Sequence, residues 1–413
     1  MNVDIQVEVR DSLDDVPEDQ WNALCHSDNP FLRHEFLQTL DDTDCLRERT
    51  GWYPRYFLLW AGEKDPDSLL AAVPCYIKTN SYGEFVFDWS WADAYQRHNM
   101  EYYPKLVSSI PFTPATGRRI LVRADQPFAE TVKLMLSAVS QYTNAEELSS
   151  AHFLFVTEEE SDILSSTTLA PSADGKEEAA MNEINRVFLR RLDCQYHWHN
   201  NDYTCFDDFL AQCSSKRRKT IRRERRHVTD AGLRLEQRSG ETLSREEWQW
   251  VHQFYRSTFD RKWGNPSLTR RFFETVGRKM GANMLIVFAY DPQDEEPERP
   301  VACSIMFVGG GRLYGRFWGC RKEYNSLHFE ACYYQGIEYC IANNIGIFEP
   351  GAQGEHKITR GFVPTLTYSS HYIRHKGFRN AIAEFLEQET PYVRQRCDGL
   401  ADLLPFKNGP LNL

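Results

Sequence analysis

The stretch LIVFAYDPQDEEPERPVACSIMFVGGGRLYGRFWG, residues 285–319, contains three short apolar segments separated by turn residues. The segments are Leu285–Tyr290, Pro300–Val308 and Arg312–Gly319. An acidic turn, Asp291–Glu296, separates the first two, and the tight turn Gly309–Gly311 separates the last two. Short β-rich runs bounded by Gly, Pro and Asp are typical of antiparallel strands. The stretch therefore predicts a three-stranded meander.

The first half of the chain repeats this rhythm at a constant distance. Arg55–Trp89 aligns with Leu285–Gly319 without a gap, because 285 minus 55 and 319 minus 89 are both 230. Each stretch reads strand, acidic turn, strand, tight turn, strand. Any two antiparallel meanders share this order, so chance stays an alternative, but a duplicated domain is the better interpretation.

Alternating strand-like and helix-like segments surround both stretches, so both halves are expected to be mixed α/β. In the first half we expect strands at Ile5–Arg10, Tyr53–Trp60, Leu69–Lys78, Glu84–Trp91 and His152–Thr157, and helices at Phe31–Asp42, Ala94–Ser109 and Phe128–Gln141. In the second half we expect helices at Cys205–Val228, Arg245–Lys262, Thr269–Lys279 and Ser326–Asn343, and further strands at Leu233–Gln237, Gly346–Glu349 and, as a pair, around Thr365–Arg374.

The chain has 413 residues, which is enough for two domains that each bury a core. The segment Glu158–Asn182 is rich in Glu, Ser and Thr and contains little that could be buried, which favours a loop near the domain boundary. We therefore expect an N-terminal domain of residues 1–182, with this acidic loop at its end, and a C-terminal domain of residues 183–413.

Charge and cysteine usage narrow the class of protein. The net charge is -11, which argues against a DNA-binding protein and requires any RNA contact to use a local basic patch. The 11 cysteines include no CxxC pair, which favours reduced thiols. No signal peptide and no membrane span is expected. His197 and His199 have no third ligand nearby in the sequence, so no metal site is expected. These features indicate a soluble cytoplasmic protein.

The order of motifs in the second half resembles the Fem-like peptidyl transferases of the GNAT acyltransferase superfamily. A basic helix (Ser214–Glu224), a meander ending Tyr314–Gly319 and then a helix and a strand carry this resemblance. The segment Leu327–Gln335, the tract Pro350–Phe362 and the aromatic run Phe87–Tyr95 resemble bacterial FemAB-like proteins, a group associated with peptidoglycan biosynthesis or recognition. The resemblance covers nearly the whole chain.

The resemblance implies two tandem GNAT-like domains with mixed, mostly antiparallel sheets. It also implies transfer of an acyl or aminoacyl group to a primary amine of a peptide or small molecule. The donor would be acyl-CoA or aminoacyl-tRNA, used as a co-substrate rather than as a tightly bound cofactor. Acetyl-CoA users usually carry Gln/Arg-x-x-Gly-x-Gly/Ala before the helix, but Cys320–Ser326 lacks these glycines, although Arg321 and Lys322 would still attract an anion.

The tract Pro350–Phe362 follows the short apolar segment Ile345–Phe348 and combines three glycines with several reactive side chains. Loops that leave strand ends are where α/β proteins place their sites. Glu355 or His356 could accept the proton of the attacking amine, and Lys357 with Arg360 could stabilise charge; Gln353 would contact substrate. A glycine-rich loop with solvated charges is the structural alternative.

Other residues complete the expected site. His328 opens the helix after the meander and is a second acid–base candidate, whereas Glu330 points from a different helix face and would help to bind substrate. In the first half, Asp88, Trp91 and Asp93 lie on one strand-like run; if the strand continued past Trp91, Trp91 and Asp93 would share a face that suits recognition at a groove, and ordinary interdomain core packing is the alternative. Arg316 and Trp318 lie on the matching strand of the second half and could form an opposite wall.

The segment Lys216–Arg226 contains eight Lys/Arg and one Glu. Its apolar residues fall on one helix face, so the other face is strongly positive. A solvated face is the default interpretation, but so many cations repel one another and suggest an anionic partner such as phosphate or tRNA. The expected contact residues are Lys216, Arg218, Lys219, Arg222 and Arg223. An RNA-binding protein and a non-catalytic recognition module therefore remain alternatives to the enzyme.

Overall fold

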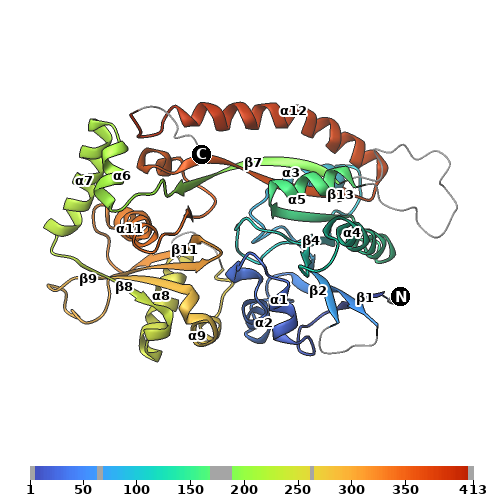
Figure 1. Ribbon diagram of the computed structural model, residues 1–413, viewed down its shortest axis with the longest axis horizontal. Coiled ribbons are helices and arrows are strands. Elements are labelled where there is room, and N and C mark those ends of the chain that lie inside the picture. Colours follow the sequence, from blue (N-terminus) through green and yellow to red (C-terminus); the bar gives the residue numbers. More distant parts are fainter. Residues whose placement is uncertain (1–4, 63–67, 168–187, 261–264, 408–413) are drawn as a thin grey trace. The chain divides into compact units, whose positions relative to one another are not determined.

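The computed structural model describes residues 5–62, 68–167, 188–260 and 265–407 of the chain. These residues pack into two compact units, shown in sequence colours in Figure 1. The first unit consists of Met1–Asp193 and Leu366–Arg394, and the second of Cys194–Thr365 and Gln395–Leu413. The expected boundary at residues 182 and 183 lies outside the described residues, and the division into 1–182 and 183–413 stays a prediction. Residues 366–394 belong to the first unit in space.

The first unit is built on one mixed sheet. Its strands follow the order β1 (Ile5–Arg10), β2 (Trp52–Ala61), β3 (Leu69–Lys78), β4 (Lys105–Ser108), β6 (Ser150–Val156) and β13 (Val363–Ile373), and β5 (Leu121–Val122) also pairs with β3. All neighbouring pairs are antiparallel except β4 with β6. The expected strands at 5–10, 53–60, 69–78 and 152–157 are confirmed.

Strict side-chain alternation along β2 gives this sheet two covered faces. Tyr56 packs edge-on against Trp21 of helix α1 (Glu18–Ala23), with ring centroids 5.8 Å apart. Its neighbour Phe57 points the other way, against Tyr142 of helix α4 (Phe128–Ala145), at 5.3 Å. Because successive side chains of a strand point to opposite faces, one strand anchors both helical layers.

The second unit contains the predicted meander. Its strands follow the order β7 (Leu189–His199), β12 (Ile347–Glu349), β11 (Arg312–Cys320), β10 (Ala302–Gly309), β9 (Met284–Tyr290) and β8 (Arg234–Ser239). The pairs β8–β9, β9–β10 and β10–β11 are antiparallel, β11 and β12 are parallel, and β12 and β7 are antiparallel. The three strands at 285–319 are confirmed, and so are those near 233–237 and 346–349.

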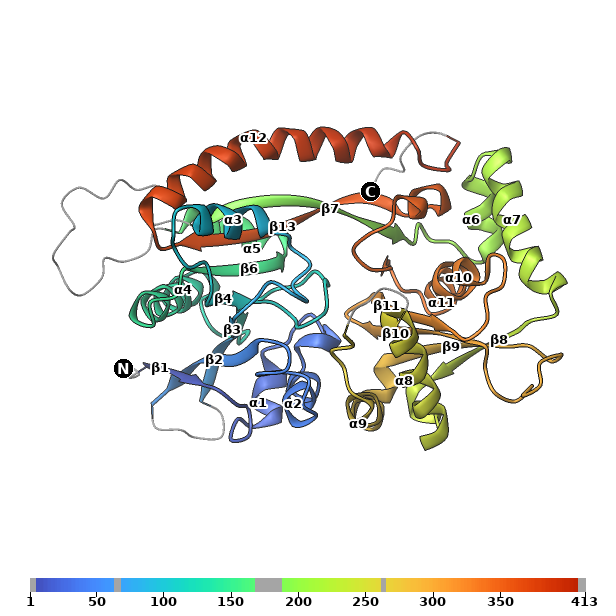
Figure 2. The same cartoon turned by 180° about the vertical axis from the view of Figure 1, so that it is seen from behind.

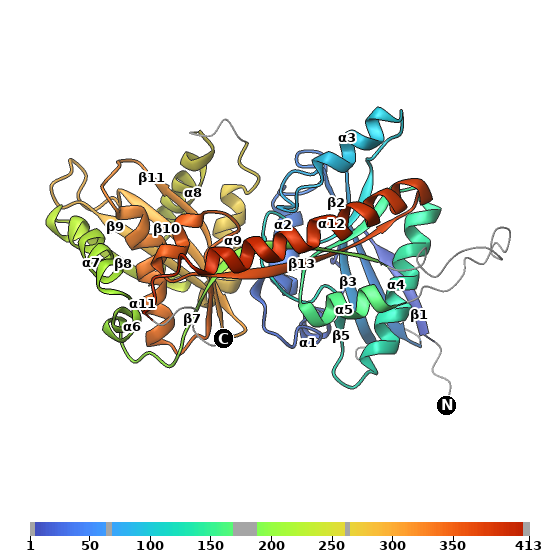
Figure 3. The ribbon, with the colours of Figure 1, turned by 90° about the horizontal axis from the view of Figure 1, so that it is seen from above.

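Strand β11 divides the second unit into two layers. Phe317 packs against Tyr255 of helix α8 (Arg245–Asp260) at 4.8 Å between ring centroids, and α9 (Arg270–Met280) lies beside α8. The next residue, Trp318, points to the opposite face, where its ring is 5.4 Å from that of His328. Figure 3 shows α8 and α11 (Gln335–Ala342) on opposite sides of these strands. The residues of the candidate site lie on the α11 side.

Further helices cover the two units or continue them. They are α2 (His34–Asp42), α3 (Trp89–Arg97) and α5 (Glu158–Ser166) in the first unit, and α6 (Phe206–Gln212), α7 (Ser215–Asp230), α10 (Leu327–Phe329) and the π-helix η6 (Glu330–Tyr334) in the second. Figure 2 shows the long helix α12 (Lys376–Ala401) in red; the sequence analysis did not predict it, and its residues up to Arg394 belong to the first unit and those from Gln395 on to the second.

Two expectations for the aromatic run in the first unit are wrong. Residues 84–91 do not form a strand: α3 begins at Trp89, and Trp91 and Tyr95 are buried four residues apart on one helix face. Asp93 is exposed on the opposite face. Over so few positions, the alternation of aromatic and acidic residues fits the two-residue period of a strand and the 3.6-residue period of a helix. The sequence pattern therefore could not distinguish a strand from a helix. The expected helix at residues 94–109 is instead the end of α3 followed by β4. Residues 82–89, all of them described, contain no strand, so the third strand of the proposed repeat is absent there.

Three boundaries were also misplaced. The expected helix 205–228 is broken between α6 and α7 at Cys213 and Ser214, whose backbones are extended or nearly so. The expected strand pair at 365–374 is the single strand β13. Residues 158–166 of the expected acidic loop form α5, capped by the Thr157 side chain, which accepts from the Glu160 amide. The rest of that loop, residues 168–182, lies outside the described residues.

The packing of α8 on β11 depends on a glycine. A Cβ atom at Gly319 would lie 1.9 Å from the carbonyl oxygen of Phe254, so the strand and the helix could not approach as they do. We expect Gly319→Ala to lower the free energy of unfolding of the second unit by about 1–3 kcal/mol, because overpacking forces the backbone to shift. Urea unfolding followed by tryptophan fluorescence measures this loss.

The matched control is Gly346→Ala, where the nearest atom to a built Cβ is 3.8 Å away. Its effect should be small, although replacing a loop glycine also changes the entropy of the unfolded chain. Equal destabilisation by the two substitutions would contradict the proposed contact.

Candidate active site

The tract 350–362 forms a loop and a short helix between β12 and β13. The loop leaves the buried strand β12, and residues Glu355–Arg360 form the 3-10 helix η7. Gly351 and Gly354 adopt φ values of 93° and 117°, which other residues rarely adopt. A Cβ atom at Gly354 would also lie 2.6 Å from the ring of His356. The glycines therefore allow a sharp turn and bring the backbone against the imidazole.

His356 is held by a tyrosine from another element. Its Nε2 atom is 2.9 Å from the hydroxyl of Tyr333 on the π-helix η6. Although His356 is an exposed residue, partial burial of its imidazole lowers its pKa below its ordinary value, and the nearby cations Arg360 and Lys357 lower it further. The imidazole is therefore neutral at pH 7. Its Nδ1 atom has no hydrogen-bond partner among the described residues, so it is available to a substrate.

Aromatic rings surround His328 and connect it to His356. The imidazole of His328 lies 5.3 Å from the ring of Tyr333 and 6.3 Å from that of His356, measured between centroids. On the sheet side it faces Trp318 at 5.4 Å. The structure thus brings together three residues that the sequence analysis placed in the site, Trp318, His328 and His356, on three different elements.

Tyr333 and Tyr334 both lie on the π-helix η6. Glu330–Tyr334 has the wider π-type turn, a feature that is frequent at functional sites. Tyr333 reaches His356, while the hydroxyl of Tyr334 makes a short hydrogen bond to Glu224. The two consecutive tyrosines therefore contact two different residues around the tract, His356 and Glu224.

Lys357 is a buried amine without a counter-ion. Only 3% of the residue is exposed, and its Nζ atom donates to the carbonyl oxygen of Gly351 at 2.7 Å. Within the described part of the chain no carboxylate forms an ion pair with it. Burial lowers the pKa of Lys357 to about 7. A substantial fraction of this amine is therefore uncharged near neutral pH, which is unusual for lysine.

Arg360 is bound to a carboxylate and is not free to hold a substrate phosphate. Its Nη2 and Nε atoms donate to the two oxygens of Glu224 at 2.6 and 3.1 Å. Its Nη1 atom donates to the carbonyl oxygen of His356 at 2.6 Å, and the guanidinium lies 3.5 Å from the ring centroid of Phe329. The position of Arg360 thus fixes the backbone next to His356.

The remaining polar residues of the tract face outward. Glu355 is exposed and forms an ion pair with Arg396 at 3.1 Å, and Gln353 is exposed. Arg316 on β11 is half-buried, with its guanidinium 5.0 Å from the ring of Phe317. Burial lowers the pKa of Arg316 to about 10, while the nearby Tyr255 and Glu349 oppose that shift.

Three charged residues near the start of α10 have partners of their own. Glu330 is buried and accepts from both Nε and Nη2 of Arg225 at 3.0 Å. Arg321 donates to Asp294 at 2.9 Å, and Lys322 donates to Asp291 at 3.1 Å. The acidic turn of the meander therefore neutralises the cations that were expected to attract a donor phosphate.

The first unit has its own buried charge cluster, which includes Asp88. The amine of Lys105 donates to Ser81 at 2.9 Å, to Glu84 at 2.8 Å and, by a short contact, to Asp88. Burial by itself raises the pKa of Asp88, but Lys105 outweighs it and holds the pKa at about 2. For Glu84, burial prevails and raises the pKa to about 7. Asp88 thus anchors the loop before α3 within the core.

Trp91 is also buried in the first unit, with its ring 4.9 Å from that of His371 and 5.1 Å from the guanidinium of Arg191. Asp93 is exposed on α3. Asp88, Trp91 and Asp93 therefore do not form one face of a groove, because the helix separates the exposed carboxylate from the two buried side chains.

Helix α7 presents most of its cations to solvent. Arg225 pairs with Glu330 and Glu338, and Arg222 pairs with Asp207 at 3.1 Å. The remaining cations have no ion-pair partner within the described parts of the chain: Lys216, Arg217, Arg218, Lys219, Arg223 and Arg226. We call these six residues the basic face of α7; Lys216, Lys219, Arg223 and Arg226 are exposed, whereas Arg217 and Arg218 are half-buried.

No group of three or more His, Cys, Asp or Glu side chains in the described ranges is placed to hold a metal ion. His197 is buried, and burial lowers its pKa to about 3; its nearest carboxylate is Glu349, at 3.9 Å. Within those same ranges, no helix is long and apolar enough to span a membrane.

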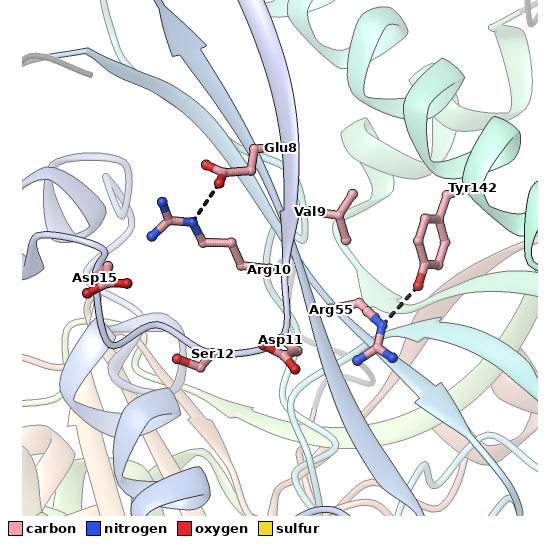
Figure 4. A pocket seen from close by; sticks show the side chains of 8 residues that line it. All are labelled: Glu8, Val9, Arg10, Asp11, Ser12, Asp15, Arg55 and Tyr142. Carbon is pink, nitrogen blue, oxygen red and sulfur yellow. Dashed lines mark hydrogen bonds and ion pairs between the residues drawn. The ribbon is translucent and has the colours of Figure 1, made fainter. Parts of the chain in front are cut away.

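The described cavities lie away from the tract. One cavity of 550 Å³ in the first unit is lined by Arg10 and Arg55 together with acidic residues, and Figure 4 shows Arg55 bonded to Tyr142 within it. A cavity of 290 Å³ in the second unit lies between α6, α7 and α11 and is lined in part by Phe206, Arg222 and Arg225. Neither cavity contains a residue of the tract.

The structure consists of two mixed α/β units with mixed, mostly antiparallel sheets, as the sequence analysis expected. The chain belongs to the FemAB-like family, described as peptidoglycan biosynthesis or recognition, whose sequence model matches residues 12–408. The expected family is confirmed by this match, and the expected fold is shared with FemX. No curated protein sequence matches the chain significantly.

Solved structures share the fold at low sequence identity. FemX is 10% identical, and the match covers 91% of this chain and all of FemX, with a TM-score of 0.50. L-PGS from Bacillus licheniformis is 12% identical over 77% of this chain and 86% of its own, with a TM-score of 0.45. A tandem GNAT protein from the clavulanic acid biosynthesis pathway is 8% identical, with a TM-score of 0.37. The match to FemX supports the fold alone.

Sequence reasoning did not identify three residues that organise the site. Tyr333 and Tyr334 were recognised only as part of a family-like segment, and Glu224 only as the single acid among cations. The isolated Glu224 within a basic helix was the available signal, since one carboxylate on the buried side of such a helix needs a cationic partner.

We expect Glu224→Ala to destabilise the second unit by about 3–5 kcal/mol, because it leaves the buried Arg360 without its carboxylate. Urea unfolding measures the loss, and adding Arg360→Met should recover part of it. The control is Asp207→Ala on α6: its ion pair with Arg222 of α7 is exposed, so the expected loss is below about 1 kcal/mol. Similar losses for the two variants would contradict the assignment.

Proposed function

We propose that the chain transfers an aminoacyl group from aminoacyl-tRNA to a primary amine of a peptide or small-molecule acceptor. The observation that carries this proposal is the buried amine of Lys357, with its pKa near 7, one residue from the neutral imidazole of His356. Transfer to an amine requires a base of suitable pKa and a hydrogen-bond donor for the developing oxyanion, but no covalent nucleophile.

In the proposed reaction the acceptor amine attacks the ester carbonyl of the donor. The new C–N bond forms, the C–O bond to the tRNA ribose breaks, and the ribose hydroxyl leaves. Uncharged Lys357 takes the proton from the attacking nitrogen and passes it to the leaving oxygen. His356 donates from Nδ1 to the oxyanion, in the tautomer that a Tyr333 hydroxyl donating to Nε2 would favour.

Two observations favour aminoacyl-tRNA over acyl-CoA as the donor. The segment Cys320–Ser326 lacks the glycines that bring backbone amides to a pyrophosphate, and Arg321 and Lys322 are paired with Asp294 and Asp291. By contrast, the basic face of α7 offers six cations without ion-pair partners in the described part of the chain. A polyphosphate backbone is the ligand that such a surface suits best.

The description of the family makes the peptide of a peptidoglycan precursor the acceptor to test first. A donor of this kind would place the reaction in the cytoplasm. His328 is proposed to orient the acceptor through its contacts with Trp318 and Tyr333, and Arg360 is proposed to position His356 rather than to bind substrate.

Turnover should depend on an uncharged Lys357. We expect single-turnover transfer from charged tRNA to rise as pH increases through about 7, because deprotonation creates the base. Lys357→Met and Lys357→Arg should both lose at least about 100-fold, and His356→Ala about 10²–10³-fold. Glu355→Gln is the matched control in the same tract and should retain most activity.

An outcome in which Lys357→Arg keeps full activity would contradict the role as a base. If no donor, charged tRNA or acyl-CoA, yields product with any amine while one of them binds tightly, a recognition module without catalysis would replace the proposed enzyme.

The substitution of Lys357 also has a signed effect on stability. The folded-state pKa is lowered, so the unfolded chain binds more protons between pH 7 and the ordinary lysine value, and the stability of the natural protein rises with pH across that range. Lys357→Met removes this dependence. Its gain in unfolding free energy over the natural chain should therefore be larger at pH 7 than at pH 9.

Binding of tRNA should depend on the basic face of α7. We expect Arg223→Glu with Arg226→Glu to weaken binding and to reduce the slope of log K against log salt concentration by about two, one for each phosphate that these arginines neutralise. The control is Arg278→Glu with Lys279→Glu on α9, which changes the net charge equally. Equal weakening by both pairs would show that only total charge matters.

A further inference from the structure

Two cysteines from distant parts of the sequence meet in the second unit. Cys194 on β7 and Cys397 on α12 have their sulfur atoms 3.1 Å apart, although 203 positions separate them in the chain. A disulfide bond requires about 2.0 Å, so a small rotation of the side chains would suffice to reach bonding distance. Neither cysteine forms a disulfide in the structure.

The two thiols differ in solvent exposure, as a pair that reacts by thiol–disulfide exchange would. Cys194 is half-buried and open to a small reagent, whereas Cys397 is buried, with 5% of the residue exposed. The accessible sulfur can make the first attack, and the buried sulfur beside it can complete the reaction. An accessible thiol with a second thiol next to it is the usual arrangement of redox-responsive pairs.

We propose that Cys194 and Cys397 are a reversible modification site that forms an intramolecular disulfide with a low-molecular-weight disulfide such as oxidised glutathione. The Cys194 thiolate attacks one sulfur of the reagent, the S–S bond of the reagent breaks, and one thiol leaves. The Cys397 thiolate then attacks the Cys194 sulfur and expels the second thiol. Overall, the two protein thiols are oxidised and the reagent is reduced to two thiols.

The location of the pair gives this bond a consequence for the site. Arg396 precedes Cys397 on α12 and forms the ion pair with Glu355 of the tract. Tyr196 on β7 lies close enough to Cys194, Cys397, Arg396 and Glu355 to interact electrostatically with all four. The disulfide would therefore fasten this turn of α12 to β7 beside the tract 350–362. This inference does not rest on the proposed reaction.

The test uses the full-length native protein in glutathione buffers of increasing oxidised fraction, quenched by alkylation and followed by peptide mass mapping. We expect a peptide pair joined through Cys194 and Cys397, with the loss of two hydrogens. The exposed Cys205 reports in the same sample that the reagent is active, since it should form a mixed disulfide. Reduction should restore both thiols.

Two variants test the order of attack. In Cys397→Ser, Cys194 should stop at the mixed disulfide with glutathione; in Cys194→Ser, Cys397 should stay unmodified while the protein is folded. The cross-linked protein should also melt roughly 5–10 °C higher, because the bond closes a long loop in the unfolded chain.

The proposal would be overturned if both Cys194 and Cys397 were recovered alkylated, and therefore still reduced, from buffers in which Cys205 forms its mixed disulfide. A cross-link that forms only after unfolding in urea would overturn it as well. Peptide mapping of the natural protein decides between these outcomes even if a variant fails to fold.

Discussion

The ion pair between Arg360 and Glu224 is the interaction on which the site depends. Two charges removed from water are stable only if several hydrogen bonds compensate for the lost hydration. Glu224 accepts from Arg360 and from Tyr334, and Arg360 also donates to the backbone of His356 and packs on Phe329. These contacts join α7, the α10–η6 segment and η7. The residues between the glycine turn and Arg360, among them His356 and Lys357, have little freedom left.

Helix α7 has two roles that follow from its composition. Its inward side contributes one carboxylate, Glu224, and the apolar residues Ile221 and Val228, all buried. Its outward side carries the basic face, whose members would repel one another without a partner. Burial of the single acid requires a cation from elsewhere in the chain, and Arg360 supplies it. The same helix therefore holds the tract 350–362 in place through Glu224 on one side and presents unpaired positive charge on the other within the described part of the chain.

Local patterns were sufficient to predict the meander and the alternation of strands and helices, because those signals lie within a few residues. The aromatic run in the first half was misread, since Trp91 and Tyr95 fit a strand and a helix equally well over so short a span. The tract 350–362 was recognised from its glycines and charges. The ion pairs that neutralise cations, such as Arg321 with Asp294, join residues far apart in the sequence and could not be predicted from it. The π-type turn at Glu330–Tyr334 has no sequence signature and could not be predicted either.

The path of the chain between the units constrains how the protein is synthesised. The chain leaves the first unit after Asp193, returns to it at Leu366 and leaves it again after Arg394, so each unit is built from two separate segments of the chain. Strand β6, buried throughout, pairs with β13 over residues 368–373. While the ribosome is still translating the intervening residues, this apolar strand has an open edge, and such edges are prone to wrong pairing. The nascent first unit therefore stays incomplete until the ribosome has translated Leu366–Arg394.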